Sequence, residues 1–234
     1  MSDLSETLML LQDVTKTFED GNRTIYAVNH LDLQIHPGEF ITLYGPSGSG
    51  KTTLLNLIGG LDRPSSGKLR IGEYNLNDMN EAQLTDLRLM EIGFIFQSYN
   101  LIPVFSALEN VAFILQMQGV DKEQAIKQSR EMLHQVGLEN MENRRPAELS
   151  GGQQQRVAVA RAIVSKPKIV LADEPTANLD SQNSQELIDL MKHLNQTHKM
   201  TFVISSHDPQ VIEAAPRKIH LKDGKIVSDE IVSD

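Results

Sequence analysis

Apolar and polar side chains alternate along the first part of the chain, in the pattern of half-buried β-strands. Leu31, Leu33 and Ile35 take every second position of one such segment, with polar residues between them. A continuous apolar run over residues 40–44 then indicates a buried strand. Residues 8–44 are therefore expected to be rich in β-structure.

Two shorter apolar runs follow, each bounded by residues that break the pattern. Serine and glycine at 65–67 and Gly72 bracket one short strand. Residues 92–96 indicate a buried strand that ends at Gln97.

Helical spacing begins soon after this strand. Ser106 and Glu109 have the Ser-x-x-Glu spacing of a capping box, which predicts a helix through about Met117. Asp121 is expected to cap a second helix that stops near Gly137.

Ser150 is expected to begin a third helix, through about Ser165, so that about residues 98–165 form an inserted, mainly helical subdomain. Strand and helix alternate again afterwards. A strand is predicted at 169–172, a helix at 183–196 and another strand at 201–205. A hairpin of two strands, at 218–221 and 225–227, is expected to follow. We expect one domain over 1–234, whose core is made of about 1–97 and 166–234.

Composition narrows the class of protein. No apolar run approaches the length of a membrane-spanning helix, and residues 1–6 are acidic where a secretory signal would be basic, so a soluble, non-exported protein is expected. The chain has no cysteine, which excludes disulfides and thiol chemistry. Its net charge of −9 disfavours direct binding to nucleic acid or anionic lipid, so no nucleic-acid partner is expected and any membrane connection should run through a protein.

The stretch after residues 40–44 combines a glycine-rich backbone with a lysine and hydroxyls. It consists of Gly45, Pro46, Ser47, Gly48, Ser49, Gly50, Lys51, Thr52 and Thr53. Its glycines let successive N–H groups surround an anion, and the following helix adds its positive end. Lys51 is expected to reach the β- and γ-phosphates of a nucleotide, and Thr52 to offer its hydroxyl to Mg²⁺. The competing interpretation is an ordinary glycine-rich loop.

Two adjacent carboxylates end the strand at 169–172. If the strand conformation persists, Asp173 and Glu174 point in opposite directions, which suits two different tasks. Asp173 is expected to support Mg²⁺, and Glu174 to act as the general base toward water. Alternatively, both acids cap the next element.

A third motif opens the helix that begins at Ser150. It consists of Leu149, Ser150, Gly151, Gly152 and Gln153. Its glycines expose backbone N–H groups and its helix dipole attracts a γ-phosphate. The same Ser-x-x-Gln spacing also makes a plain capping box, and the two interpretations do not exclude each other.

Taken in order, these motifs resemble those of ATP-binding subunits of ABC transporters. The resemblance covers nearly the whole chain and includes Asn178-Leu179-Asp180 and His207. It implies an α/β fold: a P-loop NTPase core with a mainly parallel sheet, an N-terminal antiparallel β subdomain and an inserted α-helical subdomain. Residues 59–64, 100–103 and 107–111 are most similar to the lipoprotein-releasing and macrolide-exporter class. Gln153 stands where lipoprotein-releasing subunits often have glutamate, which leaves peptide, antibiotic and lipid export open.

The resemblance also implies roles for single residues. Phe18 matches the aromatic residue that stacks on adenine. Gln97 would reach Mg²⁺ and the attacking water, and His207 would contact the γ-phosphate and hold Glu174. Taken without the family, Gln97 is a polar strand end and a lone histidine is usually structural or solvated.

Assembly is likewise implied by the family. Two copies would form an ATP-sandwich homodimer in which the Leu149–Gln153 motif and Asp180 of one copy complete the ATP site of the other. An integral-membrane permease would contact about residues 98–110. This places the chain in the cytoplasm, peripheral on the cytoplasmic face of the inner membrane.

Two functional hypotheses follow. One is an ATPase that drives a permease, and the other is a nucleotide-gated scaffold that regulates a membrane partner without transport. A DNA-repair or ribosome-associated ATPase would call for a coiled-coil insertion, a tandem cassette or a basic surface, and the sequence indicates none of these features. A GTPase would call for an Asn-Lys-x-Asp motif, which the sequence lacks.

Overall fold

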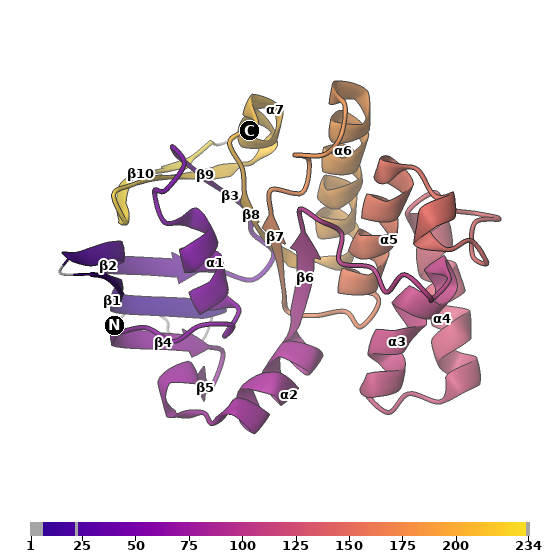
Figure 1. Ribbon diagram of the computed structural model, residues 1–234, viewed down its shortest axis with the longest axis horizontal. Helices are drawn as coiled ribbons and strands as arrows, with labels where there is room; N and C mark the ends of the chain where they lie inside the picture. The colour runs from indigo at the N-terminus through magenta and orange to yellow at the C-terminus, as the bar shows by residue number, and fades with distance from the viewer. Residues whose placement is uncertain (1–6, 22, 233–234) are drawn as a thin grey trace.

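The computed structural model describes residues 7–21 and 23–232. The acidic residues 1–6, on which the expectation of no export partly rests, lie outside this range. Two sheets and seven α-helices make up the described part of the chain (Figure 1).

The N-terminal sheet is antiparallel, with strand order β2-β1-β4-β5. Its strands are β1 (Met9–Asp20), β2 (Arg23–Ile35), β4 (Ser66–Ile71) and β5 (Tyr74–Asn75). In β2, Leu31, Leu33 and Ile35 are buried while the residues between them are exposed, which is the alternation seen in the sequence.

The second sheet is mainly parallel, with strand order β10-β9-β3-β8-β7-β6. Its strands are β3 (Phe40–Tyr44), β6 (Ile92–Phe96), β7 (Ile169–Asp173), β8 (Thr201–Ser205), β9 (Arg217–Lys222) and β10 (Lys225–Ile231). Only the β9–β10 hairpin is antiparallel. The predicted α/β architecture with a separate antiparallel sheet is confirmed.

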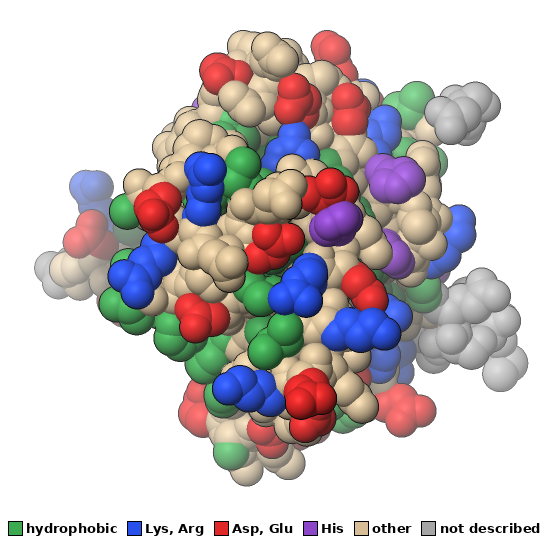
Figure 2. All heavy atoms as spheres, turned by 90° about the vertical axis from the view of Figure 1, so that its right-hand side faces the viewer, with side chains coloured by type: hydrophobic (Ala, Val, Ile, Leu, Met, Phe, Trp, Pro, Cys, Tyr) green, Lys and Arg blue, Asp and Glu red, His purple; other side chains and the backbone are tan. Residues whose placement is uncertain are grey.

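The helices fall into groups around this sheet (Figure 1). They are α1 (Lys51–Ile58), α2 (Glu81–Glu91), α3 (Ala107–Met117), α4 (Lys122–Gln135), α5 (Gly151–Ile163), α6 (Ser181–His198) and α7 (Pro209–Ala214), with single turns η2 (Leu76–Asp78) and η3 (Pro146–Glu148). Helices α3, α4 and α5 lie together to one side of the sheet. On the outer face of this group, acidic and basic side chains are interspersed (Figure 2).

The predicted caps set the helix boundaries. Ser106 and Ser150 each form a full capping box at the start of α3 and α5, and Asp121 caps α4. Helix α6 is longer than predicted because Asp180 caps it two residues earlier.

Helices α2 and α7 were not predicted from the sequence. Helix α2 begins with a capping box of Asn80 and Gln83, yet only Leu84 and Leu87 of its residues are buried, so its apolar periodicity is weak. Helix α7 spans six residues after the N-cap Asp208.

The parallel sheet separates two hydrophobic clusters. Alternate residues of one strand face opposite clusters: Ile169 and Leu171 of β7 pack with α1 and the antiparallel sheet, while Val170 and Ala172 pack with α3 to α7. The core is therefore two layers that share one sheet. No helix in the described ranges combines the length and apolar character needed to cross a bilayer.

Candidate functional site

The predicted site segments meet at one edge of the parallel sheet. Strands β3, β6, β7 and β8 run in the same direction, and the residues of interest follow their carboxyl ends. These residues are the loop from Gly45, Gln97, the pair Asp173 and Glu174, and His207. The carboxyl edge of such a sheet is where α/β proteins bind ligands.

Close backbone approach fixes the glycines of the phosphate loop. A Cβ on Gly45 would lie 2.0 Å from the carbonyl oxygen of Leu221, and one on Gly50 would lie 2.1 Å from that of Ala27. Gly50, at φ 102°, is also the N-cap of α1. The loop therefore turns directly into a helix N-terminus, where backbone N–H groups and the helix dipole favour an anion.

A cleft of about 550 Å³ opens over this loop. Its walls come from the loop, from β2 and from the ends of β6, β7 and β8. They are formed by Ile25, Tyr26, Ala27, Gly45, Pro46, Ser47, Gly48, Gly50, Lys51, Thr52, Thr53, Gln97, Glu174 and His207. The structure thus brings together residues from four of the predicted motifs.

Lys51 is the cation of this cleft. Its side chain is largely buried, and its Nζ donates hydrogen bonds to the carbonyl oxygens of Gly45 at 2.9 Å and Pro46 at 3.2 Å. These bonds hold the ammonium group across the loop, where it can neutralise phosphate charge.

Asp173 lies beside the hydroxyl of Thr52. The Oδ1 atom of Asp173 accepts a hydrogen bond from Thr52 Oγ1 at 3.2 Å and another from Ser205 Oγ. Carboxylate and hydroxyl oxygens are the hard ligands that Mg²⁺ prefers, and Mg²⁺ in such sites also takes phosphate and water ligands. The oxygen chemistry around Thr52 therefore fits Mg²⁺ bound together with a nucleotide.

Glu174 leaves the strand, unlike the prediction. Its φ is 47°, so the extended conformation ends at Asp173 and the two carboxylates diverge through a backbone turn rather than by strand alternation. The Glu174 N–H donates to the backbone oxygen of Ser205 at 3.0 Å, which ties this turn to β8.

His207 contacts Glu174 directly. The distance from His207 Nδ1 to Glu174 Oε1 is 2.9 Å, and Ser206 Oγ donates to Oε2 at 3.4 Å. An ionised carboxylate can only accept, so this bond places a hydrogen on Nδ1 and leaves Nε2 of the exposed ring for another group.

Gln97 begins a loop that is held from two sides. Its backbone oxygen accepts a hydrogen bond from Asn178 Nδ2 at 2.9 Å. Arg161 of α5 donates to the backbone oxygens of Tyr99 at 2.8 Å and Asn100 at 2.5 Å, and both residues have positive φ. Burial lowers the pKa of Arg161 from its usual value.

The Leu149–Gln153 motif stands apart from the cleft of its own chain. Ser150 Oγ accepts from the Gln153 N–H at 3.3 Å, and Gln153 Oε1 accepts from the Ser150 N–H at 2.9 Å. Asp180 accepts two hydrogen bonds from Asn183, which lower the pKa of Asp180. None of these residues lines the cleft among the residues described.

Phe18 lies at the edge of the cleft rather than in its wall. Its side chain is 45% exposed, and Lys16 Nζ lies 5.1 Å from the ring centre. Phe18 pairs across β1 and β2 with Ile25, which does line the cleft together with Tyr26. Sequence reasoning missed these two residues, because both are exposed at the start of β2, where strand alternation gives no signal.

Ser205 and Ser206 were also missed as site residues. Both are fully buried at the end of β8 and hold the two carboxylates. Their position directly before His207 was the available signal, since strand ends at this edge carry the other site residues.

The sequence of this chain matches a known protein family and several of its members. The family model described as ABC transporter matches residues 28–177. The chain is 44% identical to an uncharacterized ABC transporter ATP-binding protein, MJ0796, from Methanocaldococcus jannaschii, over 95% of this chain and 97% of that protein. It is 41% identical to the lipoprotein-releasing system ATP-binding protein LolD of Shewanella sp. (strain MR-4), over 94% of this chain and 96% of that protein.

Solved structures agree with these matches. A dimeric structure of a post-hydrolysis state of the MJ0796 cassette, bound to ADP and Pi, superposes with a TM-score of 0.89 at 43% identity. The match covers 97% of this chain and 99% of the other.

Proposed function

The chain belongs to the ABC transporter family, as an ATP-binding and ATP-hydrolysing subunit, and from this premise we propose how its residues divide the work. In the proposal, two copies close on ATP, and hydrolysis lets them separate while a membrane permease follows the motion. The observation that carries the proposal is that Lys51, Glu174 and His207 line one cleft over the phosphate loop.

Binding of ATP is assigned to the loop and the cleft wall. Backbone N–H groups of the Gly45–Thr53 loop and the Lys51 ammonium would hold the phosphates, and the exposed ring of Phe18 at the cleft edge would stack on the base. Mg²⁺, held by Thr52, Gln97 and, through water, Asp173, would supply positive charge at the β- and γ-phosphates.

Hydrolysis is assigned to Glu174. Its carboxylate would accept a proton from water while the water oxygen bonds to the γ-phosphorus and the bond from this phosphorus to the bridging oxygen of ADP breaks. His207 holds Glu174 through Nδ1, and its Nε2 faces the place of the γ-phosphate in this proposal. The products are ADP and phosphate.

The second copy completes the site. The Leu149–Gln153 motif and Asp180 do not line the cleft of their own chain, which supports their use by a partner copy. The N-terminus of α5 would then present N–H groups to the γ-phosphate bound by the other protomer. The dimeric structure of the MJ0796 cassette, bound to ADP and Pi, supports the pairing of two copies.

A groove beside the Gln97 loop is proposed to receive the permease. It has a volume of about 390 Å³ and lies between α2, β6, α3 and α5. Its apolar walls include Leu89, Phe94, Ile102 and Phe113. A short helix from the permease would fit here, against about residues 98–110, and would hold the chain at the cytoplasmic face of the membrane. In this division, about residues 98–165 act as the helical subdomain that carries the Ser150 motif.

The relatives favour release of lipoproteins as the task of the whole transporter. Several curated relatives at about this similarity are lipoprotein-releasing ATP-binding proteins. Pull-down of the membrane partner tests this assignment: a permease that releases substrate supports transport, whereas a partner that regulates a hydrolase supports the scaffold.

Two variants test the ATPase assignment. We expect Glu174→Gln to lower ATP turnover by more than about 100-fold while ATP still binds, since only the base is lost. Lys51→Ala should instead weaken nucleotide binding itself. Turnover and equilibrium ATP binding measured on both proteins separate the two roles, and normal turnover by Glu174→Gln would remove Glu174 as the base.

A further inference from the structure

A second groove lies on the other side of α2, away from the ATP cleft. It has a volume of about 500 Å³ and is enclosed by the β4–β5 turn, η2 and α2. Tyr74, Met79, Leu87 and Met90 supply its apolar surface. Tyr74 is 44% exposed and Met90 is 53% exposed, although large apolar side chains are normally buried.

Carboxylates surround this apolar surface. Glu73, Asp78, Asp86 and Glu91 line the groove, and no lysine or arginine of the described residues does. Within the same ranges, only Glu91 of these four forms an ion pair, with Lys168 at 3.1 Å. The groove therefore combines exposed apolar side chains with negative charge that the chain itself leaves largely unpaired.

The carboxylates of this acidic groove are spaced to suit a peptide segment with several positive charges. These carboxylates come from the β4–β5 turn, from η2 and from two turns of α2, so they are distributed along the groove. The lining residues of α2, at 83, 86, 87, 90 and 91, follow the spacing of a single helix face. An elongated segment with several positive charges would match this distribution.

Helix α2 is the common wall of this acidic groove and of the groove proposed for the permease. Arg88 and Leu89 face the permease groove, while Asp86, Leu87 and Met90 face the acidic groove. In Figure 1, α2 lies between β5 on one side and β6 with α3 on the other. A membrane protein docked in the first groove would have its neighbouring segments close to the second.

General membrane physics identifies the charge of such segments. Membrane proteins carry an excess of Lys and Arg in cytoplasmic segments within about 15–20 residues of the membrane spans. A cytoplasmic helix with an apolar stripe and flanking cations would bury the stripe on Tyr74 and Met90 and pair its cations with the surrounding carboxylates. Anionic lipid headgroups would be repelled by the same carboxylates.

We propose that the acidic groove beside α2 binds a basic, amphipathic cytoplasmic segment of the membrane partner, as a second contact next to the permease groove. This inference rests on the proposed function, since it assumes a membrane partner. It adds a contact whose strength depends on Glu73 and Asp86, which take no part in ATP binding.

A defined peptide tests this contact on the full chain. The probe is a fluorescein-labelled helical peptide of about 14 residues, or roughly four turns, with leucines along one face and lysines on both flanks. A scrambled peptide of the same composition lacks the apolar stripe. Fluorescence anisotropy at physiological salt measures binding to the wild type, to Glu73→Lys/Asp86→Lys and to the control Asp189→Lys/Glu213→Lys. The control makes the same change in net charge at exposed positions of α6 and α7.

We expect the groove variant to bind the striped peptide at least about 10-fold more weakly than the wild type, and the control variant to stay within about 2-fold. The neutral pair Glu73→Gln/Asp86→Asn should give an intermediate loss, and circular dichroism checks that each variant is folded. Equal weakening in the groove and control variants, or equal binding of the scrambled peptide, would reduce the effect to net charge and overturn the proposal.

ATP binding by the same preparations separates this inference from the proposed function. If the wild type binds Mg-ATP and shows no selectivity for the striped peptide, the docking proposal fails alone. If the wild type does not bind Mg-ATP, the proposed function fails.

Discussion

At the residue scale, the backbone turn at Glu174 separates two neighbouring carboxylates into different environments. Asp173 still pairs with Ser205 in the parallel sheet, and its oxygen faces Thr52. Glu174, one residue later, has left the strand and contacts His207. The assigned tasks of metal support and proton acceptance therefore depend on φ at one position.

Ser205→Ala tests how firmly Asp173 must be held. We expect ATP turnover to fall by about 10-fold, or about 1.4 kcal/mol of transition-state stabilisation, because Asp173 loses its buried hydroxyl donor. ATP affinity should change by less than about 2-fold. Steady-state kinetics checks this against Ser228→Ala, a strand serine outside the cleft. Unchanged turnover would mean that this hydrogen bond does not position Asp173.

The sequence predicted the polar site residues better than the cleft wall. Lys51, Gln97, Glu174 and His207 are identified by local motifs, and all four line the cleft. Tyr26 could not be placed in this way, because its contribution depends on how β2 pairs with β1 and lies over the loop.

At the element scale, caps predicted helices where apolar periodicity was also strong. Ser106 and Ser150 mark α3 and α5 to the residue, because a side chain that accepts from the N3 amide fixes where a helix begins. The same box at Asn80 marks α2, but this helix, which is as long as α3, buries only two leucines. A cap without a clear apolar face was not a sufficient signal.

The loop between β6 and α3 depends on Asn110. This fully buried side chain accepts from the Ile102 N–H and donates to the backbone oxygens of Ile102, Phe105 and Ser106. Asn110→Ala leaves the Ile102 N–H and the Phe105 backbone oxygen without these partners, so we expect the free energy of unfolding to fall by about 2–4 kcal/mol. Urea unfolding measures the loss against Gln116→Ala, an exposed position of α3. A loss below about 0.5 kcal/mol would contradict this role.

Arg217 joins the β9–β10 hairpin to the rest of the molecule. Its guanidinium contacts Asp229 at 2.7 Å and Glu39 at 2.8 Å. Burial lowers the pKa of Arg217, but the hydrogen bond to Asp229 and the charge of Glu39 raise it further, so the net pKa lies above its usual value.

Arg217→Met therefore leaves two carboxylates without their cation. We expect the free energy of unfolding to fall by about 2–3 kcal/mol. This is less than the loss expected on breaking a fully buried ion pair, because Glu39 and Asp229 remain partly exposed. Chemical unfolding at neutral pH measures it, and Arg63→Met, whose ion pair is exposed, should lose less than about 1 kcal/mol. Equal losses in both variants would show that burial of the Arg217 network adds nothing.

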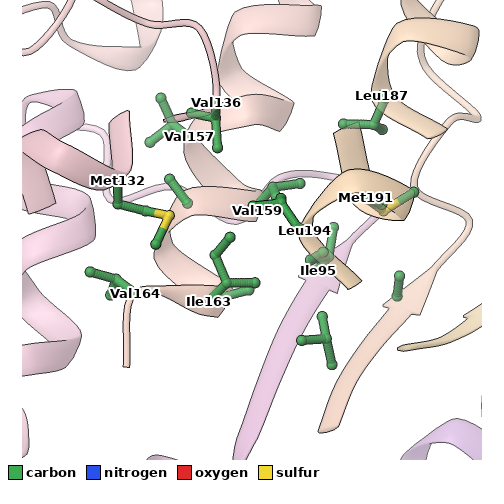
Figure 3. Close-up of a cluster of buried hydrophobic side chains, with 14 of the residues drawn as sticks. Ile95, Met132, Val136, Val157, Val159, Ile163, Val164, Leu187, Met191 and Leu194 are labelled. Carbon is green, nitrogen blue, oxygen red and sulfur yellow. The ribbon is translucent and has the colours of Figure 1, made fainter. Parts of the chain in front are cut away.

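At the scale of the whole molecule, α5 connects the two halves of one hydrophobic cluster. Figure 3 shows Val157 of α5 and the C-cap Val164 on the side of Met132 in α4. Val159 of α5 lies on the side of Leu194 in α6 and Ile95 in β6. The helix that begins with Ser150 is therefore packed onto both the helical group and the sheet. Long-range packing of this kind could not be read from the sequence, because periodicity gives the buried face and not its partner.

This packing gives the proposed closure of two copies a route to the helical group. In the proposed dimer, ATP bound to the second copy would push on the N-terminus of α5. A shift of α5 would move α4 through close-packed side chains, and it would move the Gln97 loop through the hydrogen bonds of Arg161. The route through Arg161 leads to the groove proposed for the permease, which Arg161 and Asn100 line.

The central claim is that ATP joins two copies through the Ser150 motif. Analytical ultracentrifugation of Glu174→Gln tests it most directly, because this variant should retain ATP. The account predicts dimers with Mg-ATP, monomers with Mg-ADP, and monomers again when Ser150→Arg is added although ATP still binds. A Glu174→Gln protein that stays monomeric at saturating Mg-ATP, or that dimerises equally well with Ser150→Arg, would contradict it.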